Sequence, residues 1–271
     1  MNIYLELTHR FNTGKLRAII SSGQAVVLHR LAIMSKDGDW ILREDSETMK
    51  HILTVLSEYG AQYRFGAPLD IRWMSGGWSS HFEFWHNQLR IRTDFLTRPP
   101  RISKSTLKKL WQEQKKLDLP FVGLKELAAI KMTNREKDYA VIGELARLMS
   151  NPRDQFLYSR SARDLIILAE KYPSLVQKLM RQRPFLEKIS QGRERLEEAI
   201  DAEKRMLIHV NEKRLEAYIK TSEKWQAIWP DVAKKVSGYP LIMAHEIMVK
   251  YAEEVLPFQV AGEQLNDSNQ G

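Results

Sequence analysis

The sequence predicts an α/β (α+β) protein in which a core built on a mixed sheet is followed by an all-helical C-terminal region. Short apolar runs before Pro99 have the length and composition of strands. A stretch with helical periodicity lies among them, and after Pro99 and Pro100 the pattern becomes helical almost without a break. The expected strands are residues 33–42, 64–74, 80–85 and 89–96.

The first helices are expected before the sheet begins. Residues 13–31 are mostly helical in pattern, but Ser21, Ser22 and Gly23 interrupt it. Because small residues and glycine favour a turn, this region predicts a short helix, a tight turn and a second helix from residue 24 to about residue 29.

A further helix and a hairpin are indicated within the predicted core. Residues 46–59 carry apolar side chains at helical spacing. Ser46 is the expected N-cap, and Gly60 lies just past the expected end. Residues 86–88 separate the last two strand-like runs, so we expect these two strands to form a hairpin.

The remainder of the chain predicts helices separated by prolines. The pair Asn151-Pro152 marks a natural boundary. We therefore expect a first domain over residues 1–150, a helical domain over 151–261 and a polar, disordered tail over 262–271. Breaks are expected at Pro173, Pro184, Pro230 and Pro240. The expected helices are residues 103–116, 124–133, 139–149, 162–171, 174–181, 184 to about 225, and 241–255.

The composition is that of a globular protein, with 43% hydrophobic and 28% charged residues. No apolar run approaches the roughly 18 to 20 residues that cross a bilayer, and the first residues lack the basic start and apolar core of a secretion signal. We therefore expect a cytoplasmic protein with no membrane partner. The chain has no cysteine, which excludes disulfides, thiolate metal sites and a thiol nucleophile.

Positive charge is concentrated in the predicted first domain. Residues 1–150 hold 23 Lys and Arg against 16 Asp and Glu, whereas residues 151–271 hold 19 against 18. The segment from Arg90 to Lys116 contains nine basic and two acidic residues. Such a segment suits contact with phosphate or RNA. The alternative is the solvated face of a helix, which is the commoner origin of a basic run.

Asp37, Gly38 and Asp39 form the first candidate site. On a strand, residues two apart point to the same face, so Asp37 and Asp39 would place two carboxylates side by side. Asp94, inside the apolar run at residues 89–96, would add a third carboxylate from a neighbouring strand and complete a site for Mg²⁺. The alternative is a hairpin turn, because Lys-Asp-Gly between two apolar runs is also a turn signal.

A turn upstream of the carboxylates is the second candidate. Ser22 and Gly23 open a predicted helix, and a helix start leaves backbone N–H groups free to hold phosphate oxygens. A triphosphate held there, together with a metal held by the carboxylates, is what transfer of a nucleotidyl group requires.

These motifs resemble the nucleotidyltransferase superfamily related to DNA polymerase beta, in particular its minimal bacterial branch that includes the AbiEii toxins. That branch reads Gly-Gly-x-Ala before an apolar helix that ends in His, and residues 22–29 (Ser-Gly-Gln-Ala-Val-Val-Leu-His) are similar to it. Its Asp-x-Asp before apolar residues corresponds to residues 37–42, and its third carboxylate to Asp94. Its later lysine helix and Arg-x-x-Asp correspond to residues 124–131 and 135–138. The match covers roughly residues 15–150 and departs from the pattern at Ser22, Arg30 and Ile33.

The resemblance implies catalytic roles for the carboxylates and for one lysine. Asp37, Asp39 and Asp94 would hold Mg²⁺, and Asp94 would also help to deprotonate the acceptor hydroxyl. Lys131 would assist catalysis by neutralising charge that develops on the phosphates.

The resemblance also implies a binding site for the NTP. Ser22 and Gly23 would hold its outer phosphates through backbone N–H groups. Lys131 and Arg135, expected about one helical turn apart, would face the same cleft and meet those phosphates.

The implied function is that of a transferase, which moves a nucleoside monophosphate from an NTP to a hydroxyl acceptor on RNA or protein with Mg²⁺. The implied setting is a toxin–antitoxin or phage-defence pair, with a cognate antitoxin as a further partner. Two other classes stay open. One is a non-catalytic binding module that keeps the fold, and the other is a basic RNA-binding protein that uses residues 90–116.

Histidine and tryptophan are weaker candidates. No two of the seven histidines have the spacing of a metal-ligand pair on a helix, and His81 and His86 are expected on a strand surface. Trp73, Trp78 and Trp85 are expected in the core, with a base-stacking pocket as the alternative.

Overall fold

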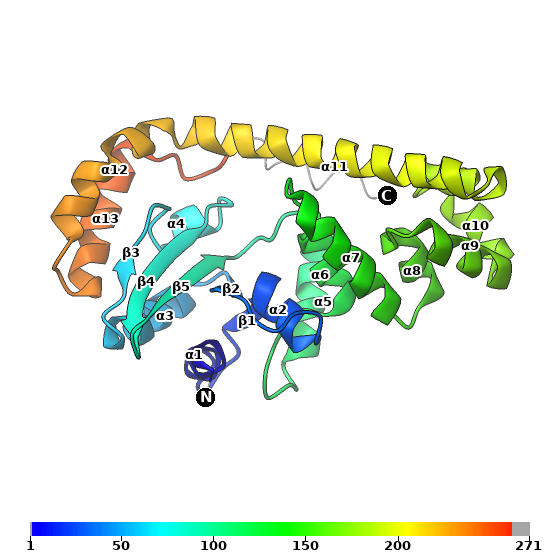
Figure 1. The fold of residues 1–271 in the computed structure, drawn as a ribbon. Coiled ribbons are helices and arrows are strands. Elements are labelled where there is room, and N and C mark those ends of the chain that lie inside the picture. Colours follow the sequence, from blue (N-terminus) through cyan, green and yellow to red (C-terminus); the bar gives the residue numbers. More distant parts are fainter. Residues whose placement is uncertain (1, 262–271) are drawn as a thin grey trace. The chain divides into compact units, whose positions relative to one another are not determined.

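The structure is a computed structural model that describes residues 2–261 of the chain. It divides into two compact units (Figure 1). Of the described residues, the first unit holds 2–28, Ala32–Val122 and 215–261; the second holds His29–Leu31 and Gly123–Arg214. The mixed sheet and the helical C-terminal region of the predicted fold class are both present.

This division differs from the predicted domain boundary. The chain leaves the sheet unit after Val122 rather than after residue 150, and it returns to that unit at Leu215. Residues 151–261, the predicted helical domain, are mainly helical. The last part of this range, however, belongs to the sheet unit. The tail predicted at 262–271 lies outside the described residues.

The sheet of the first unit has five strands, β1 (Ala18–Ser21), β2 (Asp37–Leu42), β3 (Gln62–Tyr63), β4 (Ser80–His86) and β5 (Leu89–Leu96). Their order is β1-β2-β5-β4-β3. The β2–β5 pair is parallel, and the other neighbouring pairs are antiparallel.

The predicted hairpin between β4 and β5 is confirmed. Asn87 and Gln88 form its turn, with φ of 48° and 64°. Positive φ at both positions is typical of the two-residue turn whose twist matches that of the strands. The turn therefore sets which residues of β4 and β5 face one another.

One face of the sheet packs on α1 (Ile3–Phe11) through aromatic rings. Trp40 and Phe95 stack with centroids 5.4 Å apart, and Phe11 meets both rings edge-on, at 5.3 and 5.8 Å. All three side chains are fully buried, and the Trp40 indole donates to the Thr8 hydroxyl. This face forms the core of the unit.

Three predicted helices are confirmed in the first unit, with small changes at their ends. The helix predicted at 46–59 is α3, but Asp45 caps it, accepting the N–H of Thr48 at 2.7 Å, in place of Ser46. Asp45 is the residue whose extended backbone joins the preceding segment to the helix. The helices are α2 (Ser22–Leu28), α3 (Ser46–Glu58) and α5 (Lys104–Gln114).

Two stretches fold differently from their predicted class. Residues 18–21, expected to hold the end of a short helix and the start of a turn, form β1 and pair with β2. All four side chains are buried, and so short a run has no period that separates strand from helix. Residues 64–74, expected to be a strand, contain a loop and the short helix α4 (Ile71–Met74), where Asp70 accepts the N–H of Arg72.

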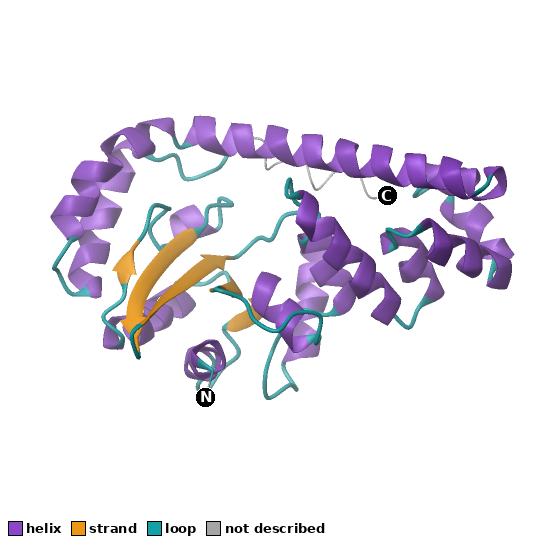
Figure 2. Ribbon diagram, in the orientation of Figure 1, coloured by secondary structure: helices purple, strands orange, loops and turns teal. Residues whose placement is uncertain are grey.

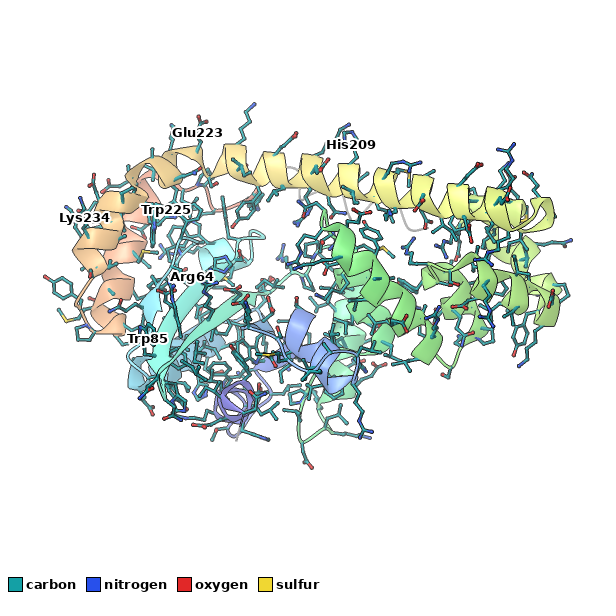
Figure 3. The ribbon with its side chains drawn as sticks, in the orientation of Figure 1. Arg64, Trp85, His209, Glu223, Trp225 and Lys234 are labelled. Atoms are coloured by element: carbon teal, nitrogen blue, oxygen red, sulfur yellow. The ribbon has the colours of Figure 1, made fainter. Side chains whose placement is uncertain are left out.

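The C-terminal helices α12 (Glu223–Val236) and α13 (Leu241–Val255) belong to the sheet unit. Three buried tryptophans attach the C-terminal segment, because a buried indole N–H needs an acceptor. The bonds run from Trp73 to the carbonyl of Leu256 (3.1 Å), from Trp78 to that of Pro257 (2.8 Å) and from Trp225 to that of Gly66 (3.0 Å). Trp73 and Trp78 thus lie in the core as predicted, but Trp85 is 71% exposed (Figure 3).

The break predicted at Pro230 is wrong, because α12 continues through it. Proline removes one helical hydrogen bond, to the carbonyl four residues earlier. Here that carbonyl belongs to Gln226, which is exposed, so water can satisfy it.

The second unit is helical (Figure 2). Its elements are α6 (Leu124–Ile130), α7 (Glu136–Leu148), α8 (Pro152–Tyr158), α9 (Ala162–Lys171), α10 (Pro173–Leu179), the 3₁₀ segment η1 (Pro184–Gln191) and the larger part of α11 (Arg193–Thr221). Phe156, Leu165 and Leu196 are fully buried in its core. Arg183, also buried, donates to Glu203 of α11 and joins that helix to the others.

Tyr63 and His245 form a polar contact between the sheet and α13. The buried Tyr63 hydroxyl accepts the N–H of Leu69 at 3.1 Å and lies 2.7 Å from Nδ1 of His245. The hydroxyl and the imidazole nitrogen share this hydrogen bond, whose direction depends on the tautomer of His245. Burial lowers the pKa of His245 to about 4 and raises the pKa of Tyr63 above its ordinary value.

We expect this histidine to make the fold less stable as the pH falls from about 6.5 toward 4. In that window the unfolded chain binds a proton at His245 and the folded chain does not, so unfolding gains up to about 3 kcal/mol. Denaturant titration followed by tryptophan fluorescence measures the effect. His245→Asn should flatten the pH dependence, whereas His209→Asn, on the surface of α11, should leave it unchanged. Identical pH profiles for all three proteins would contradict the assignment.

Candidate active site

Asp37 and Asp39 lie two residues apart on β2, on the face of the sheet opposite the aromatic core. Gly38 between them faces that core. A Cβ at Gly38 would lie 2.4 Å from the Trp40 ring and 2.6 Å from the Tyr4 ring, so only glycine fits. The hairpin-turn alternative for this motif is therefore wrong, because the glycine is required by packing within a strand.

The strand β5 brings Asp94 to the same face. In the parallel β2–β5 pair, Asp39 stands directly opposite Asp94, and Asp37 opposite Arg92. Neighbouring strands are about 4.8 Å apart, and residues opposite each other point to the same side. The three aspartates therefore meet on one face of the sheet, while their role as metal ligands stays a prediction.

The row that contains Asp39 and Asp94 continues on both sides. Ser21 of β1 is opposite Asp39, and His81 of β4 is opposite Asp94. Because Ser21 directly precedes Ser22 and Gly23, the predicted phosphate-binding turn begins next to the carboxylates.

Asp94 is held by two neighbours that both contact the same oxygen. His81 Nδ1 lies 2.7 Å from Asp94 Oδ1, and Arg64 donates to that oxygen at 3.2 Å (Figure 3 labels Arg64). The second oxygen, Oδ2, has no hydrogen bond within the described chain. The contacts thus fix the orientation of the carboxylate and leave Oδ2 available.

His81 and Arg64 are functional candidates that the sequence reasoning misses. His81 is expected on a strand surface, yet it binds Asp94 through Nδ1 and the Ser79 hydroxyl through Nε2 at 2.9 Å. One signal could have found it: a two-residue turn at 87–88 makes His86 face Leu89, which places His81 opposite Asp94. No comparable signal exists for Arg64, which lies in a loop.

Asp37 carries the clearest open position of the site. Its Oδ1 is buried and has no hydrogen-bond partner, although the whole side chain is 43% exposed. The nearest cation is Arg92, whose Nη1 is 4.0 Å away, too far for a hydrogen bond. A buried carboxylate oxygen without a partner is costly, so this atom is suited to bind a cation.

A carboxylate set of this kind fits Mg²⁺, which prefers oxygen ligands. As the side chains stand, no three His, Asp or Glu groups between residues 2 and 261 are close enough to hold one metal ion together. The carboxylates face arginine and histidine instead, so metal binding would require the side chain of Arg64 or Arg92 to move away from its aspartate.

The negative potential of the site reaches Tyr4 of α1. Burial, followed by the charges of Asp37 and Asp39, raises the pKa of Tyr4 to about 12. Its hydroxyl donates to the carbonyl oxygen of Lys36 at 2.6 Å. The phenol therefore stays protonated at neutral pH and fixes the backbone that leads into β2.

The turn at Ser22 and Gly23 is fastened to the same segment. Ser22 has a φ of 48°, and a Cβ at Gly23 would lie 2.2 Å from the hydroxyl oxygen of Ser35. The side-chain amide of Gln24 donates to the carbonyls of Ser35 (3.0 Å) and Asp37 (3.3 Å). Glycine is thus needed for a close approach between α2 and the entry to β2.

An open cavity of about 670 Å³ adjoins Asp37. Val27, Ile33 and Met34 form part of its apolar wall, and Lys36 and Arg92 supply positive charge. The predicted strand at 33–42 begins only at residue 37, so Ile33 is left 98% exposed. A volume of this size is in the range that holds a nucleotide-sized ligand.

Lys131 and Arg135 lie in the second unit. Lys131 is the C-cap of α6 and Arg135 the N-cap of α7, so a loop rather than a helical turn separates them. Both nevertheless contact one carboxylate: Asp138 lies 3.4 Å from Lys131 and 2.9 Å from Arg135, and it accepts a bond from the Thr133 hydroxyl. Their contact with phosphates stays a prediction.

Comparison with known proteins adds little. No family model matches the chain, and no curated protein matches it. Among solved structures, it is similar to a crystal structure described as a "putative nucleotidyltransferase from H. pylori", with 10% sequence identity over 78% of this chain and 96% of that one, and a TM-score of 0.39. Any conclusion about activity therefore rests on the residues of the site. No helix among the described residues is long and apolar enough to cross a membrane.

We expect Mg²⁺ to raise the melting temperature of the wild type and to have little effect on Asp37→Asn. Binding at a hundred times the dissociation constant stabilises a fold by about 2.7 kcal/mol. The substitution removes one carboxylate ligand at nearly constant volume and, without Mg²⁺, should change the unfolding free energy by no more than about 0.5 kcal/mol. Scanning fluorimetry with Mg²⁺ against Na⁺ at equal ionic strength measures both. The matched control is Asp231→Asn, on the surface of α12, and equal shifts in both variants would rule out metal binding at Asp37.

Proposed function

We propose that the protein is a Mg²⁺-dependent nucleotidyltransferase, which moves a nucleoside monophosphate from an NTP to a hydroxyl acceptor. The observation that carries this proposal is the strand register, in which Asp39 faces Asp94 while Asp37 shares their face with an unsatisfied oxygen. Carboxylates grouped on adjacent strands in this way are suited to divalent cations.

The three aspartates would have different roles. Asp37 and Asp39 would hold Mg²⁺, with Asp94 as the third ligand. Bound there, the metal would neutralise charge on the triphosphate and on the reacting phosphoryl group. The cavity beside Asp37 supplies room for the nucleotide, with an apolar wall that includes Ile33 and Met34.

Asp94 has the position of a general base. Its Oδ2 would accept the proton of the acceptor hydroxyl while that oxygen bonds to the α-phosphorus. The bond from the α-phosphorus to the bridging oxygen breaks, and pyrophosphate leaves with the electron pair. His81 and Arg64 support this step by binding Oδ1 and so directing Oδ2 toward the substrate.

Positive groups for the outer phosphates complete the proposal. Backbone N–H groups at Ser22 and Gly23 would serve, and the position of Ser21 opposite Asp39, directly before them in the chain, supports this role. For Lys131 and Arg135 the same role is supported by the sequence resemblance alone. The acceptor would be RNA or a protein side chain, and a cognate antitoxin would be the partner if the protein belongs to a toxin–antitoxin or phage-defence pair.

A second candidate is a non-catalytic module that keeps the fold. The ion pair between Arg64 and Asp94 favours it, because an arginine on a metal-binding carboxylate can stand in for the metal. Under this alternative the protein would bind its partners without turnover, whether or not Mg²⁺ is present.

Transfer of label from an α-labelled NTP tests the proposal directly, because only nucleotidyl transfer retains the α-phosphate. Each of the four NTPs would be incubated with the wild type, Mg²⁺ and total cellular RNA or protein. We expect labelled macromolecule with at least one NTP, and a loss of at least about a thousandfold in Asp39→Asn, because a metal-binding charge is removed. Asp231→Asn should keep full activity. If none of the four NTPs gave labelling, the result would favour the non-catalytic module.

Substituting the residues that hold Asp94 should lower kcat more than it raises KM for the NTP. We expect a decrease of about 10- to 100-fold for His81→Asn and for Arg64→Gln, because each loosens a carboxylate that must be correctly oriented. The Mg²⁺ concentration that gives half-maximal activity should also change. His209→Asn and Arg193→Gln, which alter exposed residues of α11, are the matched controls. A pure KM effect would show that His81 and Arg64 contact substrate instead.

A further inference from the structure

A groove of about 430 Å³ lies in the sheet unit between α5 and the segments that follow β2 and β5. It is separate from the cavity beside Asp37 and shares no lining residue with it. Its walls are mostly basic and include one partly exposed ring. The residues that matter are Arg43, Arg98, Lys104, Lys108, Trp111 and Lys115.

The groove has more positive charge than its acidic group can balance. Glu44 is its one carboxylate, and Arg98 already binds it with hydrogen bonds of 2.6 and 2.7 Å. Lys108 and Lys115 form no ion pair with any residue between 2 and 261. Both ammonium groups are therefore available to an anionic ligand from solution.

The cations are spaced along the groove rather than gathered around one point. Lys104 and Lys108 of α5 and Lys115, the C-cap of α5, lie at helical spacing, over about 16 Å at 1.5 Å per residue. A single phosphate or a small metabolite would meet only one or two of them. A row of this length suits a chain with regularly repeated negative charge.

Trp111 favours nucleic acid over other chains with repeated negative charge. It lies among the lysines of the groove, and the guanidinium of Arg43 stacks on its ring at 5.2 Å from the centroid. Stacking on aromatic and guanidinium planes is how proteins bind the bases of single-stranded nucleic acid without reading their sequence. An acidic peptide would gain nothing comparable from this pair.

The groove is also placed in line with the carboxylates. Arg43 directly follows β2 and Arg98 lies two residues after β5, so both are at the end toward which these parallel strands run, four residues after Asp39 and Asp94. At about 3.3 Å per residue, four residues span at most about 13 Å of backbone. A single strand whose terminal hydroxyl reached Asp94 could therefore lay its preceding phosphates in the groove.

We propose that this groove binds the sugar–phosphate backbone of a single-stranded RNA end, which is the acceptor in the transfer reaction. The acceptor role rests on the proposed function, but binding of RNA does not. Of the two acceptors that the site chemistry allows, the groove thus selects RNA over a protein side chain.

Fluorescence anisotropy with a labelled single-stranded RNA oligonucleotide, in EDTA and without NTP, tests the groove apart from catalysis. We expect the double variant Lys108→Glu/Lys115→Glu to bind at least about tenfold more weakly at low salt, because two phosphate contacts become repulsive. The slope of log K against log salt should fall by about 0.7 for each phosphate that the variant no longer neutralises. Lys50→Glu/Lys250→Glu, with the same charge change on exposed lysines of α3 and α13, should bind within about twofold of the wild type. Circular dichroism and melting temperature verify that both variants fold.

Three results would overturn the proposal. The two double variants could show the same decrease in RNA affinity, which would leave net charge as the explanation. Polyglutamate could compete with RNA at equal charge, which would make the groove a general polyanion site. The groove variant could instead lack the NTP-dependent thermal shift and keep RNA binding, which would assign the groove to the triphosphate.

Failure of the groove and failure of the proposed function give different results. Asp39→Asn should keep the full RNA affinity of the wild type while its transfer activity disappears. The protein could bind RNA through Lys108 and Lys115 and yet transfer no label from any NTP. That result would reject the proposed nucleotidyltransferase activity and support the groove as an RNA-binding site. Transfer activity that is unaffected in the groove variant would reject the groove as the acceptor site and leave the proposed nucleotidyltransferase activity supported.

Discussion

The parallel pairing of β2 with β5 is the constraint on which the candidate site depends, because it sets Asp39 directly opposite Asp94. Like charges at such positions destabilise a sheet. The other face of the same two strands compensates, since Trp40 and Phe95 are fully buried there and stack on each other. A slip of one residue would exchange the two faces and bury the aspartates. The aromatic core therefore determines the register that brings the carboxylates together.

The charges around the aspartates reduce their repulsion without closing the site. Arg64 and His81 share one oxygen of Asp94, and Arg92 stays 4.0 Å from Asp37. The contact of His81 continues through the Ser79 hydroxyl to Tyr218, 3.3 Å from it near the end of α11. The returning C-terminal segment thus contacts the residues that hold Asp94. Its three indole bonds to carbonyls attach this segment to the sheet unit.

Much of the fold is visible in local sequence patterns. The alternation around Asp37 and Asp39, the hairpin before Asp94 and the basic face of α5 follow from side-chain period and turn chemistry, which involve only near neighbours. The same local information would place His81 opposite Asp94, because a two-residue turn sets the register of a hairpin. Residues 18–21 are the opposite case, since their strand exists only through pairing with β2.

The sequence by itself identified most of the candidate residues: the aspartates, the glycines that their packing requires and the lysines of one basic segment. Only the tertiary structure decided which of them come together. The adjacency of β2 and β5, the contact of Arg64 with Asp94 and the return of residues after Leu215 to the sheet unit all join segments far apart along the chain. Such contacts depend on the summed burial of many side chains, and no local pattern records that sum.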